Sequence, residues 1–326
     1  MQYRTLGKTG LKVSEIGYGT WQFANDADCW VGATREESTK SLLLALDSGV
    51  NFIDTARVYG DGLSEQWVGA IIKQRPTANL VIASKILPLN HQWPAQKGIG
   101  IREVFPKKHI IKQVEDSLKT LDREYLDLMQ FHVWQDDWAN EDEWQQTILQ
   151  LTRQGKVKYW GISTNNYEST NCIKVCQTGL ISVIQTIFNL FYQEPIQSLF
   201  PFVKDNNLGL IARVPLDEGG LTGTINSTTV FPAGDFRRSY FSPDRLVELE
   251  KRTDQLQLYV TGDVNSLTEL ALRFILSFDA VSTVIPGMRK TRHVQENMAL
   301  SAKPKFGQKL LEELVQHVWN RNFYET

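Results

Sequence analysis

The sequence predicts an α/β fold, specifically a (β/α)8 barrel of the TIM type. Short apolar runs alternate with helix-period segments along the chain, and a strand followed by a helix after a short turn requires parallel pairing. Hydrophobic residues make up 42% of the 326 residues, which supplies enough apolar surface for one large closed core. The length would suggest about two domains by counting alone, but barrels of this size commonly form one. We therefore expect residues 1–326 to form a single domain.

The predicted elements begin with a hairpin. The run from Gly7 to Gly10 predicts a turn between short strands at 3–6 and 11–14. Apolar runs then predict strands at 15–18, 50–53, 80–84, 126–131, 157–162, 182–186, 208–213 and 281–285. Helix periodicity predicts helices at 36–48, 64–74, 107–121, 141–154, 168–178, 195–207, 265–278 and 291–299.

Capping signals support these boundaries. Thr34 and Glu37 have capping-box spacing before the first long helix. Gly49, Gly155 and Gly179 each follow a predicted helix, where a C-terminal cap belongs. About eight strand-helix units close naturally into a barrel, and a doubly wound sheet is the alternative fold.

Two phosphate-binding motifs are missing from the sequence. Gly17 and Gly19 follow the first predicted strand, but no third glycine completes a dinucleotide fingerprint, and no P-loop motif occurs. A Rossmann cofactor site and P-loop phosphoryl transfer are therefore not expected. In a barrel, the chemistry belongs at the carboxyl ends of the strands.

Composition limits the partners. A net charge of -2 shows no attraction for nucleic acid or an anionic membrane, so we expect a small-molecule partner. The amino-terminal segment lacks an apolar targeting core, and no run approaches the ~20 apolar residues that span a bilayer. Cys29, Cys172 and Cys176 show no metal-ligand spacing, so we expect no metal and a reducing, cytoplasmic environment. The oligomeric state stays open.

Four proton-active side chains lie at or just beyond the ends of predicted strands. Asp54 follows 50–53, Lys85 follows 80–84 and His132 follows 126–131, while Tyr59 comes shortly after Asp54. If these strands are neighbours in a parallel sheet, their carboxyl ends bring the four side chains around one point. The pattern predicts a proton-transfer site.

These residues belong to a series of motifs that resembles the aldo-keto reductase superfamily, in particular bacterial-type NADPH-dependent aldo/keto reductases. The matching segments run in order over nearly the whole chain: 52–56 with 59–60, 83–85, 125–132, 161–163, 215–223, 285–287 and 296–297. The resemblance implies a (β/α)8 enzyme that reduces aldehydes or ketones with a nicotinamide cofactor. It also implies that the hairpin at 3–14 closes the floor of the barrel.

A carbonyl reduction needs a hydride donor at carbon and a proton donor near oxygen. Tyr59 is the expected acid, and Lys85 should bring its pKa from the free value of ~10 closer to neutral. The resemblance implies that Asp54 holds Lys85. His132 would donate a hydrogen bond to the substrate oxygen or share the proton relay. The alternative for Asp54 and Lys85 is a buried ion pair with no catalytic role.

The nicotinamide carboxamide has candidate ligands after the fifth and sixth strands. Ser163 and Gln185 match family positions that hydrogen-bond this group. Many relatives have asparagine directly after the serine, whereas this chain has Thr164 and then Asn165, so either could make that contact.

Arg213 stands where many relatives have a tyrosine on which the nicotinamide stacks. A planar guanidinium can also stack, but its charge would disfavour the oxidised, positively charged ring. The alternative is a surface ion pair with Asp217 or Glu218.

The rest of the cofactor is expected along the loop at 216–223 and after the last strand, where the resemblance implies pyrophosphate and adenosine sites. Arg289 could neutralise a 2′-phosphate, which favours NADPH over NADH. The further cofactor-binding residues expected are Gly19, Thr20, Trp21, Pro215, Leu216, Gly219, Leu221, Gly223, Ile285, Gly287, Arg289, His293, Gln295 and Asn297.

Aromatic residues suggest a substrate pocket at the same mouth, suited to hydrophobic or aromatic carbonyls. Tryptophans can also simply pack loops. The expected pocket residues are Trp21, Tyr59, Trp93, His132 and Trp134.

Two rival functions are considered. One is a cofactor-binding regulatory subunit without a metabolic substrate, because some relatives sense nicotinamide as partners of other proteins. The other is a barrel lyase or isomerase that uses Lys85 as a Schiff base, which requires Lys85 to be free rather than paired with Asp54.

Overall fold

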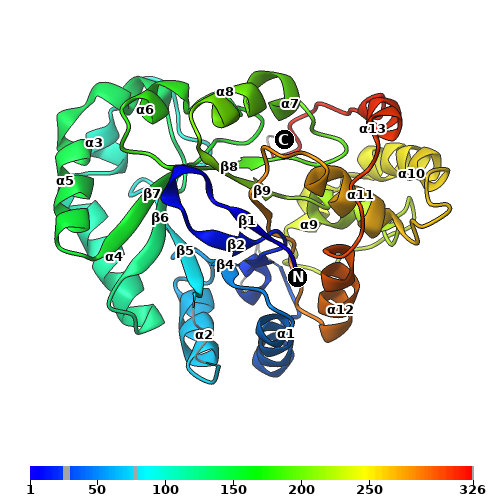
Figure 1. Cartoon of the computed structure of the whole chain (residues 1–326), viewed down its shortest axis with the longest axis horizontal. Coiled ribbons are helices and arrows are strands. Elements are labelled where there is room, and N and C mark those ends of the chain that lie inside the picture. Colours follow the sequence, from blue (N-terminus) through cyan, green and yellow to red (C-terminus); the bar gives the residue numbers. More distant parts are fainter. Residues whose placement is uncertain (25–29, 76–78, 325–326) are drawn as a thin grey trace.

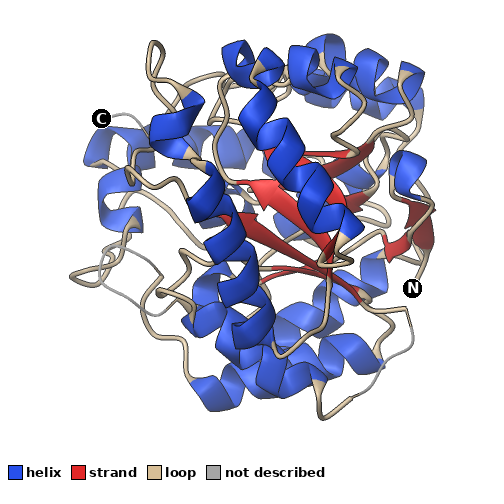
Figure 2. Cartoon of the chain, turned by 90° about the vertical axis from the view of Figure 1, so that its left-hand side faces the viewer, coloured by secondary structure: helices blue, strands red, loops and turns tan. Residues whose placement is uncertain are grey.

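Eight parallel strands form the centre of the molecule, and helices surround them (Figure 1, Figure 2). The computed structural model describes residues 1–24, 30–75 and 79–324, so Cys29 lies outside the described residues. The strands pair in chain order: β3 (Tyr18–Gly19), β4 (Phe52–Asp54), β5 (Val81–Ile86), β6 (Leu126–Phe131), β7 (Val157–Ser163), β8 (Val183–Ile187), β9 (Gly209–Arg213) and β10 (Thr283–Val284).

The ends of this sheet meet and close the barrel. Ile16 pairs with Val284, and Gly19 pairs with Gly287, both in parallel register. Gly19 is needed here because an added Cβ would lie 2.8 Å from the carbonyl oxygen of Ile285. The predicted barrel is thus confirmed, and the doubly wound alternative is wrong because the outer strands of such a sheet do not meet.

The main barrel helices follow their strands as predicted. They are α1 (Arg35–Asp47), α2 (Leu63–Ile72), α4 (Lys107–Leu121), α5 (Asp142–Arg153), α6 (Ile173–Gln177), α7 (Pro195–Ser198), α8 (Phe200–Asp205), α11 (Leu267–Leu276) and α12 (Thr291–Leu300). Thr34 caps α1 by accepting a hydrogen bond of 3.2 Å from the backbone N–H of Glu37. The predicted helix at 195–207 is divided into α7 and α8, because Pro201 has no N–H to continue the first helix.

Further helices lie outside the predicted pattern: α3 (Ile101–Val104), α9 (Arg237–Tyr240), α10 (Pro243–Gln257) and α13 (Gln308–Val315). Two of them, α9 and α10, lie between β9 and α11, where a simple barrel has a short connection. No helix in the described part of the chain is long and apolar enough to cross a membrane.

The amino-terminal hairpin fills the floor of the barrel, as the family resemblance implied. Its strands β1 (Tyr3–Thr5) and β2 (Lys12–Ser14) are antiparallel, and Figure 1 shows them across the barrel. Leu6 and Val13 are fully buried and pack in the barrel interior with Phe52, Val81, Leu128 and Val183. Because the floor is packed, space for a ligand is left at the opposite end, where the strands have their carboxyl ends.

Candidate active site

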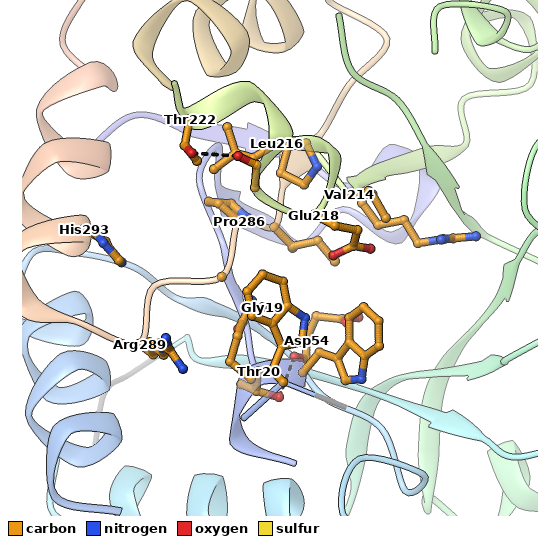
Figure 3. Close-up of a pocket in the computed structure, with 18 of the residues that line it drawn as sticks. Gly19, Thr20, Asp54, Val214, Leu216, Glu218, Thr222, Pro286, Arg289 and His293 are labelled. Carbon is orange, nitrogen blue, oxygen red and sulfur yellow. Dashed lines mark hydrogen bonds between the residues drawn. The ribbon is translucent and has the colours of Figure 1, made fainter. Parts of the chain in front are cut away.

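A long cavity of about 1140 Å³ opens at the carboxyl ends of the strands. Figure 3 shows Gly19, Thr20 and Asp54 on one side of it, Leu216 and Thr222 of the facing loop on the other, and Arg289 and His293 at one end. The predicted site residues that line this cavity are Gly19, Thr20, Trp21, Asp54, Tyr59, Trp93, His132, Ser163, Thr164, Asn165, Gln185, Arg213, Pro215, Leu216, Gly219, Ile285, Gly287, Arg289, His293 and Asn297.

Lys85 lies directly behind the cavity wall, fully buried in β5. Its ammonium forms an ion pair with Asp54, which ends the neighbouring strand β4. It also donates hydrogen bonds to the carbonyl oxygen of Thr55 at 2.9 Å and to the hydroxyl of Tyr59 at 3.3 Å. Three of the four predicted side chains are therefore joined in one hydrogen-bonded group.

The second carboxylate oxygen of Asp54 is held from two further strands. The amide nitrogen of Gln185 on β8 donates to it at 2.8 Å, and that of Gln130 on β6 donates at 3.3 Å. Asp54 thus keeps a fixed orientation toward Lys85. Sequence reasoning missed Gln130, although its inward place in a strand of strictly buried residues was a signal for a polar role.

Burial sets the proton affinity of Tyr59. Removal of its hydroxyl from water raises the pKa of Tyr59 above its ordinary value, and the charge of Lys85 offsets this only in part. Lys85 lowers this pKa, which is the expected direction of its effect, but burial has the larger effect and the pKa stays above its ordinary value. Burial by itself lowers the pKa of Lys85, but the carboxylate of Asp54 and the contact with Tyr59 outweigh it and raise that pKa. At neutral pH Tyr59 is a protonated phenol beside a charged ammonium.

His132 lies on the other side of Tyr59, just beyond β6. The two rings meet edge to face with 5.9 Å between their centroids, and Trp93 meets the imidazole in the same way at 5.8 Å. Burial lowers the pKa of His132 well below its usual value, and the charges of Lys85 and Arg213 lower it further. His132 is thus neutral at pH 7, and its buried Nδ1 has no hydrogen-bond partner among the described residues.

The segment after β7 holds Thr164 and Asn165, one of which was expected to contact the nicotinamide carboxamide, but both side chains make hydrogen bonds within the protein. Asn165 uses its side-chain oxygen to accept from the backbone N–H of Ala95 at 3.3 Å, and its amide nitrogen donates to Glu168 at 2.9 Å. Its amide therefore holds the neighbouring loop. Thr164 donates to the hydroxyl of Thr186 at 3.0 Å.

Arg213, at the end of β9, reaches across to this segment. Its guanidinium donates to the carbonyl oxygen of Thr164 at 3.1 Å and to the side-chain oxygen of Asn166 at 2.9 Å. Asn166 also lines the cavity, and sequence reasoning missed it. The alternative ion pair is not formed, because Asp217 is paired with Arg245 and no described cation pairs with Glu218. The Nε of Arg213 is buried without a partner among the described residues.

Basic side chains gather at the far end of the cavity. Arg289 donates to the carbonyl oxygen of Val31 at 2.8 Å and, like Lys290, Arg292 and His293, lines the cavity. Positive charge at one end, with hydroxyl and amide groups at the other, fits a long anionic ligand with a polar head. A nicotinamide dinucleotide has this chemistry.

Aromatic rings surround the mouth above Tyr59. Trp21 stacks on Tyr59 with 6.3 Å between centroids and packs against Phe236 at 4.7 Å. Trp30, which the sequence reasoning did not select, also lines the cavity, and its buried indole nitrogen has no partner in the described part of the chain. Trp93 is 42% exposed at the rim, so a bulky apolar group could meet it.

Besides Lys85, four predicted residues do not line the cavity. Trp134 is fully buried among Phe131, Trp138 and Trp144, so its expected place in the substrate pocket is wrong. The end of β6 was predicted correctly, but the chain beyond the strand directs the indole of Trp134 into the core. Leu221 is buried, Gly223 ends the 3₁₀ helix η4 (Asp217–Thr222), and Gln295 is exposed on α12, away from the cavity.

Comparison with known proteins decides the family. A family model described as the Aldo/keto reductase family matches residues 15–318, which is nearly the whole chain. The chain belongs to the aldo/keto reductase family. Its members are oxidoreductases that use nicotinamide cofactors and act on small-molecule carbonyl compounds.

The relatives of this aldo/keto reductase include both enzymes and channel subunits. Aldo-keto reductase YhdN of Bacillus subtilis (strain 168) is 31% identical over 89% of this chain and 86% of its own length. A probable voltage-gated potassium channel subunit beta of Oryza sativa subsp. japonica is 30% identical over 96% of this chain and 95% of its own. Among solved structures, a glycerol dehydrogenase of Gluconobacter oxydans is 26% identical, with a TM-score of 0.78 over 98% of this chain and 97% of that one.

Proposed function

We propose that this aldo/keto reductase reduces aldehydes or ketones to alcohols with NADPH, and that Tyr59 is the general acid. The observation that supports this most directly is the hydroxyl of Tyr59 at the cavity wall, 3.3 Å from the buried ammonium of Lys85. When bound, the reduced nicotinamide supplies a hydride to the carbonyl carbon. Tyr59 gives its proton to the carbonyl oxygen, so the alcohol forms and a phenolate is left beside Lys85.

The neighbours of Tyr59 take separate tasks in this proposal. Lys85 stabilises the phenolate, and Asp54 keeps the ammonium charged and aimed. His132, neutral at pH 7, donates a hydrogen bond to the substrate oxygen from one ring nitrogen. Trp21 and Trp93 favour hydrophobic or aromatic substrates.

Ser163, Gln185 and Asn166 would hold the carboxamide of the nicotinamide. The amide nitrogen of Gln185 is used by Asp54, so its oxygen is left to accept from the carboxamide. Arg213 fixes the oxygen of Asn166, which leaves the amide nitrogen of Asn166 to donate. Asn165 is excluded from this proposal because its amide holds the neighbouring loop.

Arg213 would lie against the nicotinamide ring, where its charge disfavours the oxidised form. At the other end, Arg289 with Lys290 and His293 supports recognition of a 2′-phosphate, and therefore NADPH over NADH. We also propose that residues 1–326 form one domain and that the protein is cytoplasmic.

A regulatory, cofactor-binding subunit is the second candidate, and the similarity to a potassium channel subunit supports it. The hydrogen bond from Lys85 to the hydroxyl of Tyr59 favours the carbonyl reductase over the regulatory subunit. A lyase that attacks substrate with Lys85 is disfavoured because the ammonium is charged and hydrogen-bonded to three partners.

A panel of aldehydes and ketones, including nitrobenzaldehyde, tests the proposal through the loss of NADPH absorbance, with NADH in parallel. We expect turnover with NADPH and a lower Michaelis constant for NADPH than for NADH. Tyr59→Phe should lower turnover by a factor of about 10²–10⁴, while NADPH binding measured by fluorescence survives. Undiminished turnover in that variant would remove Tyr59 from the acid role. Tight NADPH binding without turnover on any carbonyl would favour the regulatory subunit.

A further inference from the structure

Two adjacent residues of η4 are anchored in different ways. Asp217 is fixed in the core: Arg245 of α10 donates to both of its oxygens at 2.9 and 3.0 Å, and the hydroxyl of Tyr240 donates at 2.7 Å. Glu218 is also buried, yet no ion pair joins it to a cation among the described residues. Its one hydrogen-bond partner in the described part of the chain is the hydroxyl of Tyr324.

Glu218 and Tyr324 both line the cavity, although they are far apart in sequence. Figure 3 shows the side chain of Glu218 directed from the loop toward the cavity. Their contact therefore joins the loop at 216–223 to the carboxyl-terminal tail across the wall of the cavity.

The tail that carries Tyr324 is itself docked. The backbone N–H of Trp319 donates to the carbonyl oxygen of Phe191 at 2.7 Å. The ring of Phe323 lies 3.4 Å from the guanidinium of Arg245, and the ring of Tyr324 packs on Tyr240 at 4.8 Å. Arg245 thus supports both the loop, through Asp217, and the tail, through Phe323.

The backbone of η4 needs such support. Asp217 and Glu218 have φ values of 48° and 52°, in the left-handed region that disfavours residues with a side chain, and Gly219 follows at 104°. Consecutive residues in this region persist only where their surroundings hold them. Glu218 is held by one hydroxyl, whereas Asp217 is held by a salt bridge.

We propose that Tyr324 is a positioning residue for the cofactor: with Glu218 it forms a latch that holds η4 closed over NADPH and opens when NADPH leaves. This rests on the proposed function, because the ligand beneath the loop is taken to be NADPH. In this latch the salt bridge between Arg245 and Asp217 stays in place, and the hydrogen bond from the Tyr324 hydroxyl to Glu218 is the contact that breaks. Tyr324→Phe removes that hydroxyl and leaves the ring to pack on Tyr240.

Two measurements test the latch. The first is amide hydrogen exchange of residues 216–223 in the cofactor-free protein, which requires neither NADPH binding nor activity. The second is the rate of NADPH release in stopped-flow fluorescence. In Tyr324→Phe we expect exchange and release each to rise by about tenfold, the usual effect of losing a hydrogen bond to a charged group.

Tyr259→Phe is the matched control, because the hydroxyl of Tyr259 contacts His317, away from the cavity. It should leave exchange at 216–223 and NADPH release unchanged. The double variant Tyr324→Phe/Glu218→Gln should release NADPH no faster than the faster single variant, since both changes act through one contact. Additive effects, or exchange in Tyr324→Phe equal to that of the wild type, would overturn the latch. Failure of the wild type to bind NADPH would instead overturn the proposed function, and the exchange experiment would still decide whether the contact holds the loop.

Discussion

Lys85 donates a hydrogen bond to the hydroxyl of Tyr59 while its ammonium is paired with Asp54. With the carbonyl oxygen of Thr55 as its third acceptor, all three N–H bonds of the ammonium have partners. The direction of the Tyr59 hydroxyl is therefore fixed from inside the barrel.

Lys85→Met should abolish turnover and destabilise the fold. The variant leaves the carboxylate of Asp54 buried without its cation, and such a loss typically costs ~3–5 kcal/mol of unfolding free energy. Thermal and urea unfolding measure the cost, and NADPH consumption measures the turnover. Lys73→Met is the matched control, since it removes an exposed ion pair with Asp122 and should cost at most ~1 kcal/mol. A Lys85→Met protein as stable and active as the wild type would contradict the assigned role.

The rate of carbonyl reduction should be nearly independent of pH between 7 and about 9. The pKa of Tyr59 is raised above its ordinary value, so the acid stays protonated throughout this range. The pKa of His132 is lowered well below 6.5, so its titration falls on the acid side of the range. A pH profile of kcat/KM checks both statements. A loss of activity centred near neutral pH that disappears in His132→Asn would show that His132 titrates there.

Arg213→Tyr should improve binding of the oxidised cofactor relative to the reduced one. Arg213 carries its charge beside the proposed nicotinamide site without an ion-pair partner among the described residues, and only the oxidised ring is positively charged. Removing that repulsion should change the affinity ratio by about tenfold, equivalent to ~1.4 kcal/mol. Dissociation constants for NADP⁺ and NADPH give the ratio. An unchanged ratio would place Arg213 away from the ring.

Glu218 should make stability depend on pH. Burial raises the pKa of Glu218 to about 7, despite the Tyr324 hydroxyl and the charges of Arg213 and Arg245, while the charge of Asp217 adds to the rise. A carboxyl group whose pKa is higher in the folded than in the unfolded protein loses stability as pH rises from the unfolded value through the folded one. The free energy of unfolding of Glu218→Gln, relative to the wild type, should therefore increase between pH 4.5 and about 7, by on the order of 3 kcal/mol. If the difference in unfolding free energy between Glu218→Gln and the wild type is constant across that range, the pKa of Glu218 is not raised.

The strands could be predicted because each is a short, almost wholly apolar run ending in a turn. The strand predicted at 126–131 is β6 (Leu126–Phe131). Asp54, Lys85 and His132 directly follow the predicted strands at 50–53, 80–84 and 126–131, and the structure gathers them at the mouth of the barrel, with Lys85 behind the cavity wall. The helix α10 (Pro243–Gln257) was missed because it is an addition to the repeating strand-helix pattern. Its N-terminal cap, Ser242, is a signal that could have located it.

Side-chain direction and long-range contacts were harder to predict. Trp134 and His132 are two residues apart, yet one is in the core and the other lines the cavity, because the chain has left the strand and period-two alternation no longer applies. Tyr324 contacts Glu218 only through the fold of the whole chain, and no local pattern in the sequence connects them.

The docked tail also affects how the protein should be handled. The hairpin at residues 3–14 lies at the floor of the barrel, whereas Tyr324 borders the cavity at the mouth. A purification tag attached behind Tyr324 would start from a residue at the ligand entrance, and one attached ahead of the hairpin would start at the far end. Cofactor affinities measured with the two tags should therefore differ, and the amino-terminal tag is the one to use.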